Sequence, residues 1–164
     1  MTKKRTLLAT AVLTFSLLTG CGTNTSLTEF EKNMDTFYTE ITAIGKSLDA
    51  VNPNSINATS EVLGYLQKME QQFQFLANME IPKEFFNIED LADDAAEYMT
   101  EALNLYTQVY NSEDFGENVA SAAFENYNSA MKRVNYIACL LQGEIPEGAS
   151  IIEIDNTNSE SYPE

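Results

Sequence analysis

Apolar residues recur through most of this chain at alternating spacings of three and four positions. The first run is unbroken, and its members are Leu27, Phe30, Met34, Phe37, Ile41, Ile44, Leu48 and Val51. This spacing places one apolar stripe along one side of an α-helix, as in helices that pack lengthwise against others. The pattern therefore predicts a helix over residues 26–51, which the polar segment Asn52-Pro53-Asn54-Ser55 ends.

Three further runs predict helices over residues 57–79, 87–111 and 113–142. The first of them ends before Ile81-Pro82, because the residue before a proline disfavours helical geometry. Gly143 is well placed to end the last one. The apolar positions of the three runs are, in order, Val62, Leu66, Met69, Phe73 and Leu76; Ile88, Leu91, Ala95, Tyr98, Ala102, Leu105 and Val109, with Ala92, Met99 and Tyr106 in a parallel stripe; and Phe115, Val119, Ala123, Tyr127, Ala130, Val134, Ile137 and Leu141.

Four amphipathic helices joined by short connections predict an all-α protein, an antiparallel up-down four-helix bundle over residues 26–143. Helices in such bundles cross at about 20°. The alanines of the third and fourth helices would let those two approach closely. Residues 144–164 are expected to form an extended, partly disordered tail. Within that tail, Ile151–Ile154 is a candidate to pack back on the bundle.

The N-terminal segment has a different composition from the four runs. Lys3, Lys4 and Arg5 precede an apolar stretch from Leu7 to Leu18. This order is typical of a secretory signal, and the stretch is shorter than the about 20 apolar residues that span a bilayer. The stretch ends in Leu18, Thr19, Gly20 and Cys21, which resemble the lipobox of bacterial lipoproteins.

That resemblance implies cleavage of residues 1–20 and attachment of diacylglycerol to the Cys21 sulfur, with or without a further N-acyl chain such as palmitate. Residues 21–25 would then form a lipidated tether. The mature chain would lie at the extracytoplasmic face of the cell membrane, with its first helix close to the lipid. The alternative interpretation is an ordinary signal peptide in which Cys21 is incidental.

The body of the chain also resembles small helical lipoproteins of Gram-positive bacteria. The likeness covers Ile81-Pro82-Lys83-Glu84-Phe85 and the stretch from Leu91 to Met99, and it implies no particular activity. In the connection between the second and third helices, Phe85-Phe86 would lie at the membrane pole of the bundle. These two rings either cap the open end of the core or rest on the lipid interface.

The mature chain is strongly acidic. Three of the nine basic residues precede Cys21 and all 25 acidic residues follow it, so six positive and 25 negative charges remain, a net charge of −19. This charge repels phosphate backbones and excludes nucleic acid as a partner. It favours cations and cationic peptides.

The densest acidic feature lies on the third predicted helix. A face of this kind is compatible with binding a divalent cation through carboxylates, or a basic partner. It lacks the loop and ligand spacing of an EF-hand, and the simpler interpretation is a solvated surface, so no metal site is predicted. Its members are Glu89, Asp90, Asp93, Asp94, Glu97 and Glu101.

Three tyrosines on the third and fourth predicted helices, Tyr98, Tyr106 and Tyr127, are candidates to line a small-ligand pocket between helices. The alternative is that they lie at the edge of the core with their hydroxyls reaching water. Cys139 is expected to be a buried small residue without an activating base nearby.

Enzyme chemistry is not expected. The chain has no histidine, which removes the commonest general base and transition-metal ligand and with it di-iron and c-type haem sites. No catalytic residue and no cofactor other than the lipid on Cys21 is therefore predicted. The expected function is a non-enzymatic binding or scaffolding module of the cell envelope, with a protein or peptide partner. The alternatives are an acidic bundle that sequesters divalent cations or cationic peptides, and a small-ligand receptor.

Overall fold

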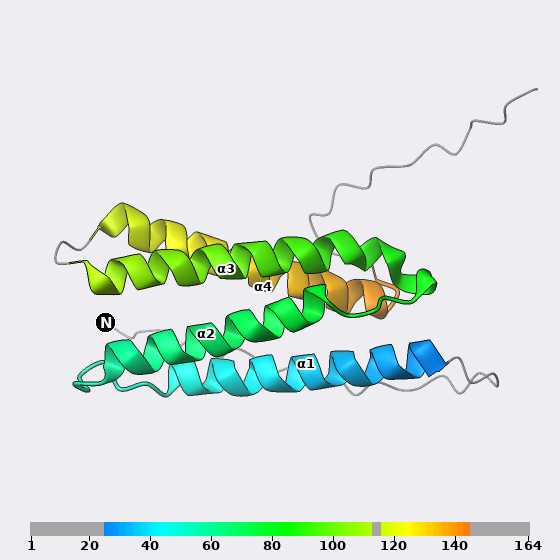
Figure 1. Ribbon diagram of the computed structural model, residues 1–164, viewed down its shortest axis with the longest axis horizontal. Coiled ribbons are helices and arrows are strands. Elements are labelled where there is room, and N and C mark those ends of the chain that lie inside the picture. The colour runs from blue at the N-terminus through cyan, green and yellow to red at the C-terminus, as the bar shows by residue number, and fades with distance from the viewer. Residues whose placement is uncertain (1–24, 113–115, 145–164) are drawn as a thin grey trace, which may run out of the picture.

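The structure, a computed structural model, describes residues 25–112 and 116–144. It contains four α-helices, α1 (Thr25–Asp49), α2 (Ala58–Ala77), α3 (Glu89–Asn111) and α4 (Glu117–Leu141), and a 3₁₀ helix, η1 (Lys83–Ile88). The four α-helices run alternately up and down the long axis (Figure 1). The predicted all-α, up-down four-helix fold is confirmed. The predicted signal, lipobox and tether up to residue 24, and the tail from residue 145, lie outside the described residues.

The observed and predicted helix ends differ most at the starts of the third and fourth helices. The sequence places the start of the third helix at residue 87, but the chain is already in a 3₁₀ turn from Lys83. The turn begins directly after Pro82, whose φ of −59° is preset for helical geometry and whose carbonyl accepts a hydrogen bond from the Phe85 N–H at 2.8 Å. α4 begins at Glu117, four residues after the predicted start at residue 113, because its N-cap Gly116 has an extended backbone (φ −82°, ψ 94°). The remaining observed helix ends fall within two residues of those predicted.

The core is made of apolar side chains from all four α-helices. Its centre is an edge-to-face contact between Phe37 of α1 and Phe73 of α2, whose ring centroids are 5.8 Å apart. Both rings are fully buried, and among the described residues no polar or charged side chain is buried. The burial of α1 follows the predicted stripe: Phe30, Met34, Phe37, Ile41 and Ile44 are buried, and Leu27, Leu48 and Val51 at its ends are half-buried.

On α3 the buried face is wider than the predicted main stripe, of which Ala95, Ala102 and Val109 are buried. Ala92 and Met99, predicted as a secondary stripe, are fully buried, whereas Leu91, Tyr98 and Leu105 of the main stripe are only half-buried. The reason is the position of α3 between α2 and α4, which it contacts on two sides. A helix with two neighbours buries a wider face than a single stripe provides.

Small side chains bring α3 and α4 together. Ala92, Ala95, Ala96 and Ala102 of α3 and Ala123 and Ala130 of α4 are all buried, and α3–α4 is the most extensive helix contact in the molecule. The α2–α3 contact is supplemented by hydrogen bonds at its surface, where Gln74 donates to the Thr100 hydroxyl at 3.1 Å and that hydroxyl donates to Glu70 at 3.3 Å.

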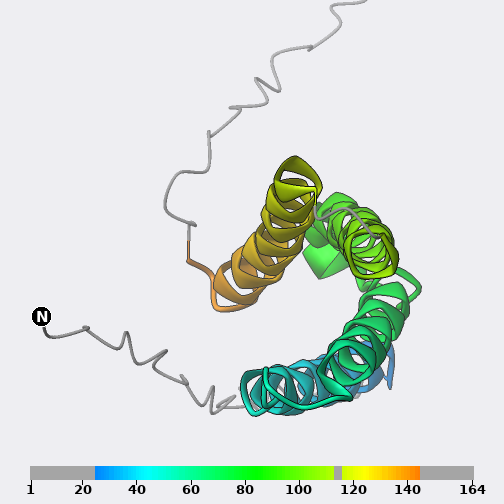
Figure 2. The ribbon, with the colours of Figure 1, turned by 90° about the vertical axis from the view of Figure 1, so that its left-hand side faces the viewer.

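The bundle is open along one side. α1 packs on α2, α2 on α3 and α3 on α4, but no Cα atom of α1 lies within 8 Å of one of α4. Viewed along the bundle, the helices form an arc with α1 and α4 at its ends (Figure 2). The Tyr38 hydroxyl of α1 crosses this side and donates to the Val134 carbonyl of α4 at 3.4 Å.

One pole of the bundle gathers the start of α1, the η1 turn and the end of α4 (Figure 1). There Phe85 stacks on Phe30, with ring centroids 5.5 Å apart, and so caps the core. Its neighbour Phe86 is 72% exposed. Phe85 therefore caps the core, which was one of the two predicted roles for this pair. Phe86 lies on the surface.

The close α3–α4 packing predicts that an added side chain there is costly. Ala130→Leu should lower the free energy of unfolding by about 1–3 kcal/mol, because the extra methyl groups meet a filled interface. Urea unfolding followed by circular dichroism measures this. Ala43→Leu, at an exposed position of α1, is the matched control and should change stability by less than about 0.5 kcal/mol; equal effects of the two substitutions would contradict the packing argument.

Tyr38 predicts a loss of stability in alkali. Burial raises the pKa of its hydroxyl well above the ordinary value of 10.0, and the nearby Cys139 adds to the shift. The folded state thus retains the neutral phenol while the unfolded chain ionises above pH 10, so stability is complete below pH 10 and falls as pH rises beyond it, by at most about 1.4 kcal/mol per pH unit.

Tyr38→Phe should therefore lower stability at pH 7 by about 0.5–1.5 kcal/mol, through the lost hydrogen bond, yet flatten the decline above pH 10. Urea midpoints between neutral and alkaline pH give both quantities. Tyr110→Phe, at an exposed ring, serves as the control and should change the alkaline decline much less, because Tyr110 contributes only a secondary part of the raised pKa of Tyr106. An unchanged slope in Tyr38→Phe would show that this hydroxyl does not govern it.

Candidate functional surfaces

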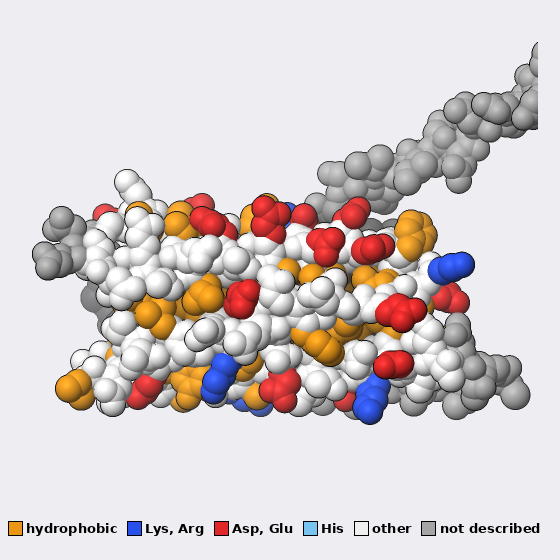
Figure 3. All heavy atoms as spheres, in the orientation of Figure 1, with side chains coloured by type: hydrophobic (Ala, Val, Ile, Leu, Met, Phe, Trp, Pro, Cys, Tyr) orange, Lys and Arg blue, Asp and Glu red, His pale blue; other side chains and the backbone are white. Residues whose placement is uncertain are grey.

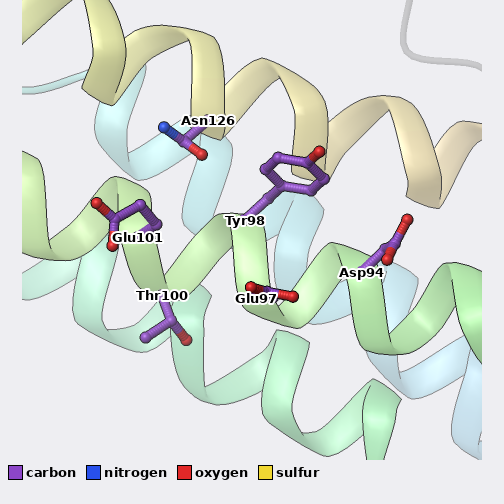
Figure 4. A pocket seen from close by; sticks show the side chains of 6 residues that line it. All are labelled: Asp94, Glu97, Tyr98, Thr100, Glu101 and Asn126. Carbon is purple, nitrogen blue, oxygen red and sulfur yellow. The ribbon is translucent and has the colours of Figure 1, made fainter.

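The predicted acidic face lies on the outer side of α3. Glu89, Asp90, Asp93, Asp94, Glu97 and Glu101 are all exposed. Four polar or charged residues of α3 and one of α4 line a shallow depression of about 420 Å³ with Tyr98 (Figure 4); they are Asp94, Glu97, Thr100, Glu101 and Asn126. On the face seen in Figure 3, acidic side chains are spread along the molecule and do not converge on one point.

An arginine of α4 partly neutralises this face. Arg133 lies 3.5 Å from the Asp94 carboxylate, and its guanidinium stacks 4.3 Å from the centre of the Tyr98 ring. It also donates to the Tyr98 hydroxyl at 3.4 Å. The Tyr98 ring thus stacks against Arg133, and its hydroxyl oxygen accepts a hydrogen bond from the same arginine.

The acidic face has no geometry for a metal ion. Across residues 25–112 and 116–144, no three or more carboxylate or thiol side chains come together in a way that would hold one. The carboxylates at i, i+4 spacing on α3 point into water, where like charges cost a few tenths of a kcal/mol per pair. This surface is better suited to a diffuse cationic partner than to a bound ion.

The open side of the bundle carries a second surface, the α1–α4 groove, which sequence reasoning did not predict. It is a cavity of about 590 Å³ with mainly apolar walls. The apolar part comes from both helices, and Phe124 of α4 stands in it with 57% of its surface exposed. The lining residues are Ile41, Thr42, Gly45, Lys46, Leu48 and Asp49 of α1, and Phe124, Tyr127, Asn128 and Met131 of α4.

A signal for this groove was present in the sequence. Phe124 follows Ala123, which is buried in the core, so a helix that buries Ala123 must turn Phe124 about 100° away. Met131 lies seven residues later on the same line of α4, and both are outside the predicted stripe. Large apolar residues off the core stripe of an otherwise polar helix face indicate a second contact surface.

The three candidate tyrosines do not form one pocket. Tyr98 faces the α3–α4 depression, whereas Tyr127 lines the α1–α4 groove. Burial, and secondarily Asp49 across the groove, raises the pKa of Tyr127. Tyr106 stacks on Tyr110 with ring centroids 6.4 Å apart, and its pKa is raised by burial first and then by Tyr110 and Tyr127. Only Tyr127 belongs to a groove with apolar walls.

Neither the described cysteine, nor the character of the helices, nor comparison with known proteins assigns a function to this chain. Cys139, the cysteine that the structure describes, is half-buried and unpaired. No helix within the two described ranges combines the length and apolar character needed to cross a bilayer. Comparison with protein-family models, with curated proteins and with solved structures found no match to this chain.

Proposed function

We propose that this protein is a lipid-anchored, extracytoplasmic lipoprotein that acts as a non-enzymatic binding module of the cell envelope, with the α1–α4 groove as its binding surface. The observation that carries the binding role is the groove itself. A four-helix arc whose first and last helices have no Cα atoms within 8 Å of each other leaves apolar walls without a partner. Leaving Phe124 and its neighbours in water costs about 25 cal/mol per Å² of apolar surface, which an occupant would recover.

The occupant that fits best is an amphipathic helical segment of another envelope protein or peptide, with a basic polar face. An apolar groove between two helices is the usual binding site of such a helix. The groove wall itself carries Lys46 and Asp49, one charge of each sign. The net charge of −19 on the mature chain would attract a basic segment from a distance and repel an acidic one.

The proposed anchor would also set the distance between the groove and the membrane. Only Gly22-Thr23-Asn24 separate Cys21 from the first residue of α1, a reach of about 14 Å. The pole with η1 and the exposed Phe86 would then stand next to the lipid. Met131 and Phe124 lie about 15 and 26 Å from the end of α4 at that pole, so the groove faces sideways above the membrane.

A small-ligand receptor is the second candidate, because the volume of the groove lies in the range of ligand sites. The groove is open along its length and, among the predicted tyrosines, contains only Tyr127. These features favour a peptide over a small molecule. Sequestration of divalent cations has no geometric support in the described residues.

Anchoring is tested at Cys21. Cys21→Ala should block both acylation and cleavage before residue 21, so the chain should keep its signal and incorporate no labelled fatty acid. Metabolic labelling and the mass of the purified protein measure these changes. Leu7→Arg within the apolar stretch, which should abolish export altogether, is the comparison. Normal processing of the Cys21→Ala chain would refute the lipoprotein assignment.

Groove binding is tested with a defined probe, a fluorescent synthetic Leu/Lys amphipathic helix, and residues 22–164, which retain every packed helix. Binding should weaken at least about tenfold in Phe124→Ser with Met131→Ser, because each buried side chain of this size contributes about 1.5–3 kcal/mol. Fluorescence anisotropy gives the dissociation constant. Rising salt should also weaken binding.

Two controls separate the groove from general attraction to an acidic protein. Phe75→Ser removes a comparably exposed ring on α2, outside the groove, and should leave the affinity unchanged. A Leu/Glu helix of the same length should bind more weakly than the Leu/Lys helix. Equal affinities for the groove variant and for Phe75→Ser would exclude the groove as the binding surface.

A further inference from the structure

We infer that the chain's own C-terminal strip, Ile151–Ile154, docks in the α1–α4 groove when no partner is bound and must be displaced by one. The inference concerns the regulation of the groove on which the proposed function rests. The strip belongs to the segment beyond residue 144, outside the described residues.

The end of α4 turns the chain out of the helix. Gly143 has a φ of +73°, which a residue with a side chain rarely adopts. The Glu144 N–H donates to the Cys139 carbonyl at 2.9 Å, and the Gly143 N–H donates to the Leu140 carbonyl at 3.0 Å. These two bonds make a Schellman motif, which stops a helix and sends the following chain away from its axis. α4 therefore ends at this motif, before Glu144.

The length of the following segment matches the position of the groove. Ile151 and Ile154 follow Glu144 by seven and ten residues, so extended backbone reaches about 23 and 33 Å from it. The groove residues of α4, Met131 and Phe124, lie about 15 and 26 Å back from Leu141. A strand running back along α4 thus brings the isoleucines to the groove with several ångströms to spare for the turn.

The chemistry of the strip suits the walls. Ile151, Ile152 and Ile154 are the only large aliphatic residues after Ile145. In an extended strand, Ile152 and Ile154 point to the same side, while Glu153 and Asp155 point to the other. One face of the strip can therefore enter between Phe124 and Met131 while the acidic face remains in water.

Because the strip is tethered to the bundle, even a weak contact with the groove is sufficient for docking. A segment joined to its site by a short chain is present at an effective concentration in the millimolar range. The segment from residue 145 to 164 contains five acidic and no basic residues, so the acidic body repels it. Docking of the tail therefore strengthens with salt, whereas binding of a basic partner weakens with salt. A basic helix at low salt displaces the tail.

The test uses the absence of tryptophan from this chain. In residues 22–164, Phe124→Trp places one fluorophore in the groove, where its emission maximum reports whether water reaches the ring. Ile152→Glu with Ile154→Glu should shift that emission to longer wavelength and increase quenching by acrylamide. Asn156→Glu with Asn158→Glu adds the same charge beyond the strip and should leave the emission where it was. Circular dichroism checks that each form is equally helical.

The outcomes are distinct. Identical emission from the two tail variants overturns the inference, as does an emission maximum that depends on protein concentration and not on the isoleucines, which would indicate a second copy in the groove. Increasing salt should move the emission of the unaltered tail to shorter wavelength, and no response or the opposite one also contradicts docking.

The proposed function is tested separately by the Leu/Lys helix. If the tail docks, this helix should bind more tightly to Ile152→Glu with Ile154→Glu than to Asn156→Glu with Asn158→Glu, at equal charge. If it binds neither form while the two emissions still differ, the partner proposal fails and the inference stands. If it binds both forms equally and the two emissions coincide, the inference fails and the partner proposal stands.

Discussion

The close packing of α3 on α4 determines the shape of this bundle. Alanines on both helices bring the two backbones together, while α1 enters the core with large side chains such as Phe30, Met34 and Phe37. A helix held off by phenylalanine and methionine cannot also reach a helix that is drawn toward α3. The open α1–α4 side, the Tyr38 hydroxyl that crosses it and the apolar groove all follow from this asymmetry of side-chain size.

The sequence predicted the fold well because the spacing of apolar residues reports helices directly. The stripe of α1 was predicted residue by residue, since α1 has one neighbour and buries one face. For α3 the prediction was less exact: Ala92 and Met99 of the parallel stripe are fully buried, whereas Leu91 of the main stripe is only half-buried. Spacing within one helix carries no information on how many neighbours that helix will have, and the number of neighbours decides the width of the buried face.

The candidate surfaces were less predictable for the same reason. The acidic face of α3 is local to one helix, so its exposure could be predicted from spacing. Its pairing with Arg133 could not, because that contact depends on the register between α3 and α4. The groove depends on the separation between the α1 and α4 backbones, and no pattern within either helix specifies that separation. Phe124 was the available sign of it.

The position of α1 has a mechanical consequence. Among the described helices α1 contacts only α2 along its backbone, so it is the least supported of the four, and its packing is the first that a pulling force would break. If the chain is anchored through Cys21 as proposed, a force between the membrane and the bundle would act at the start of α1. A partner bound between α1 and α4 would connect these two helices. A force on α1 would then be shared between its contact with α2 and its contact, through the partner, with α4.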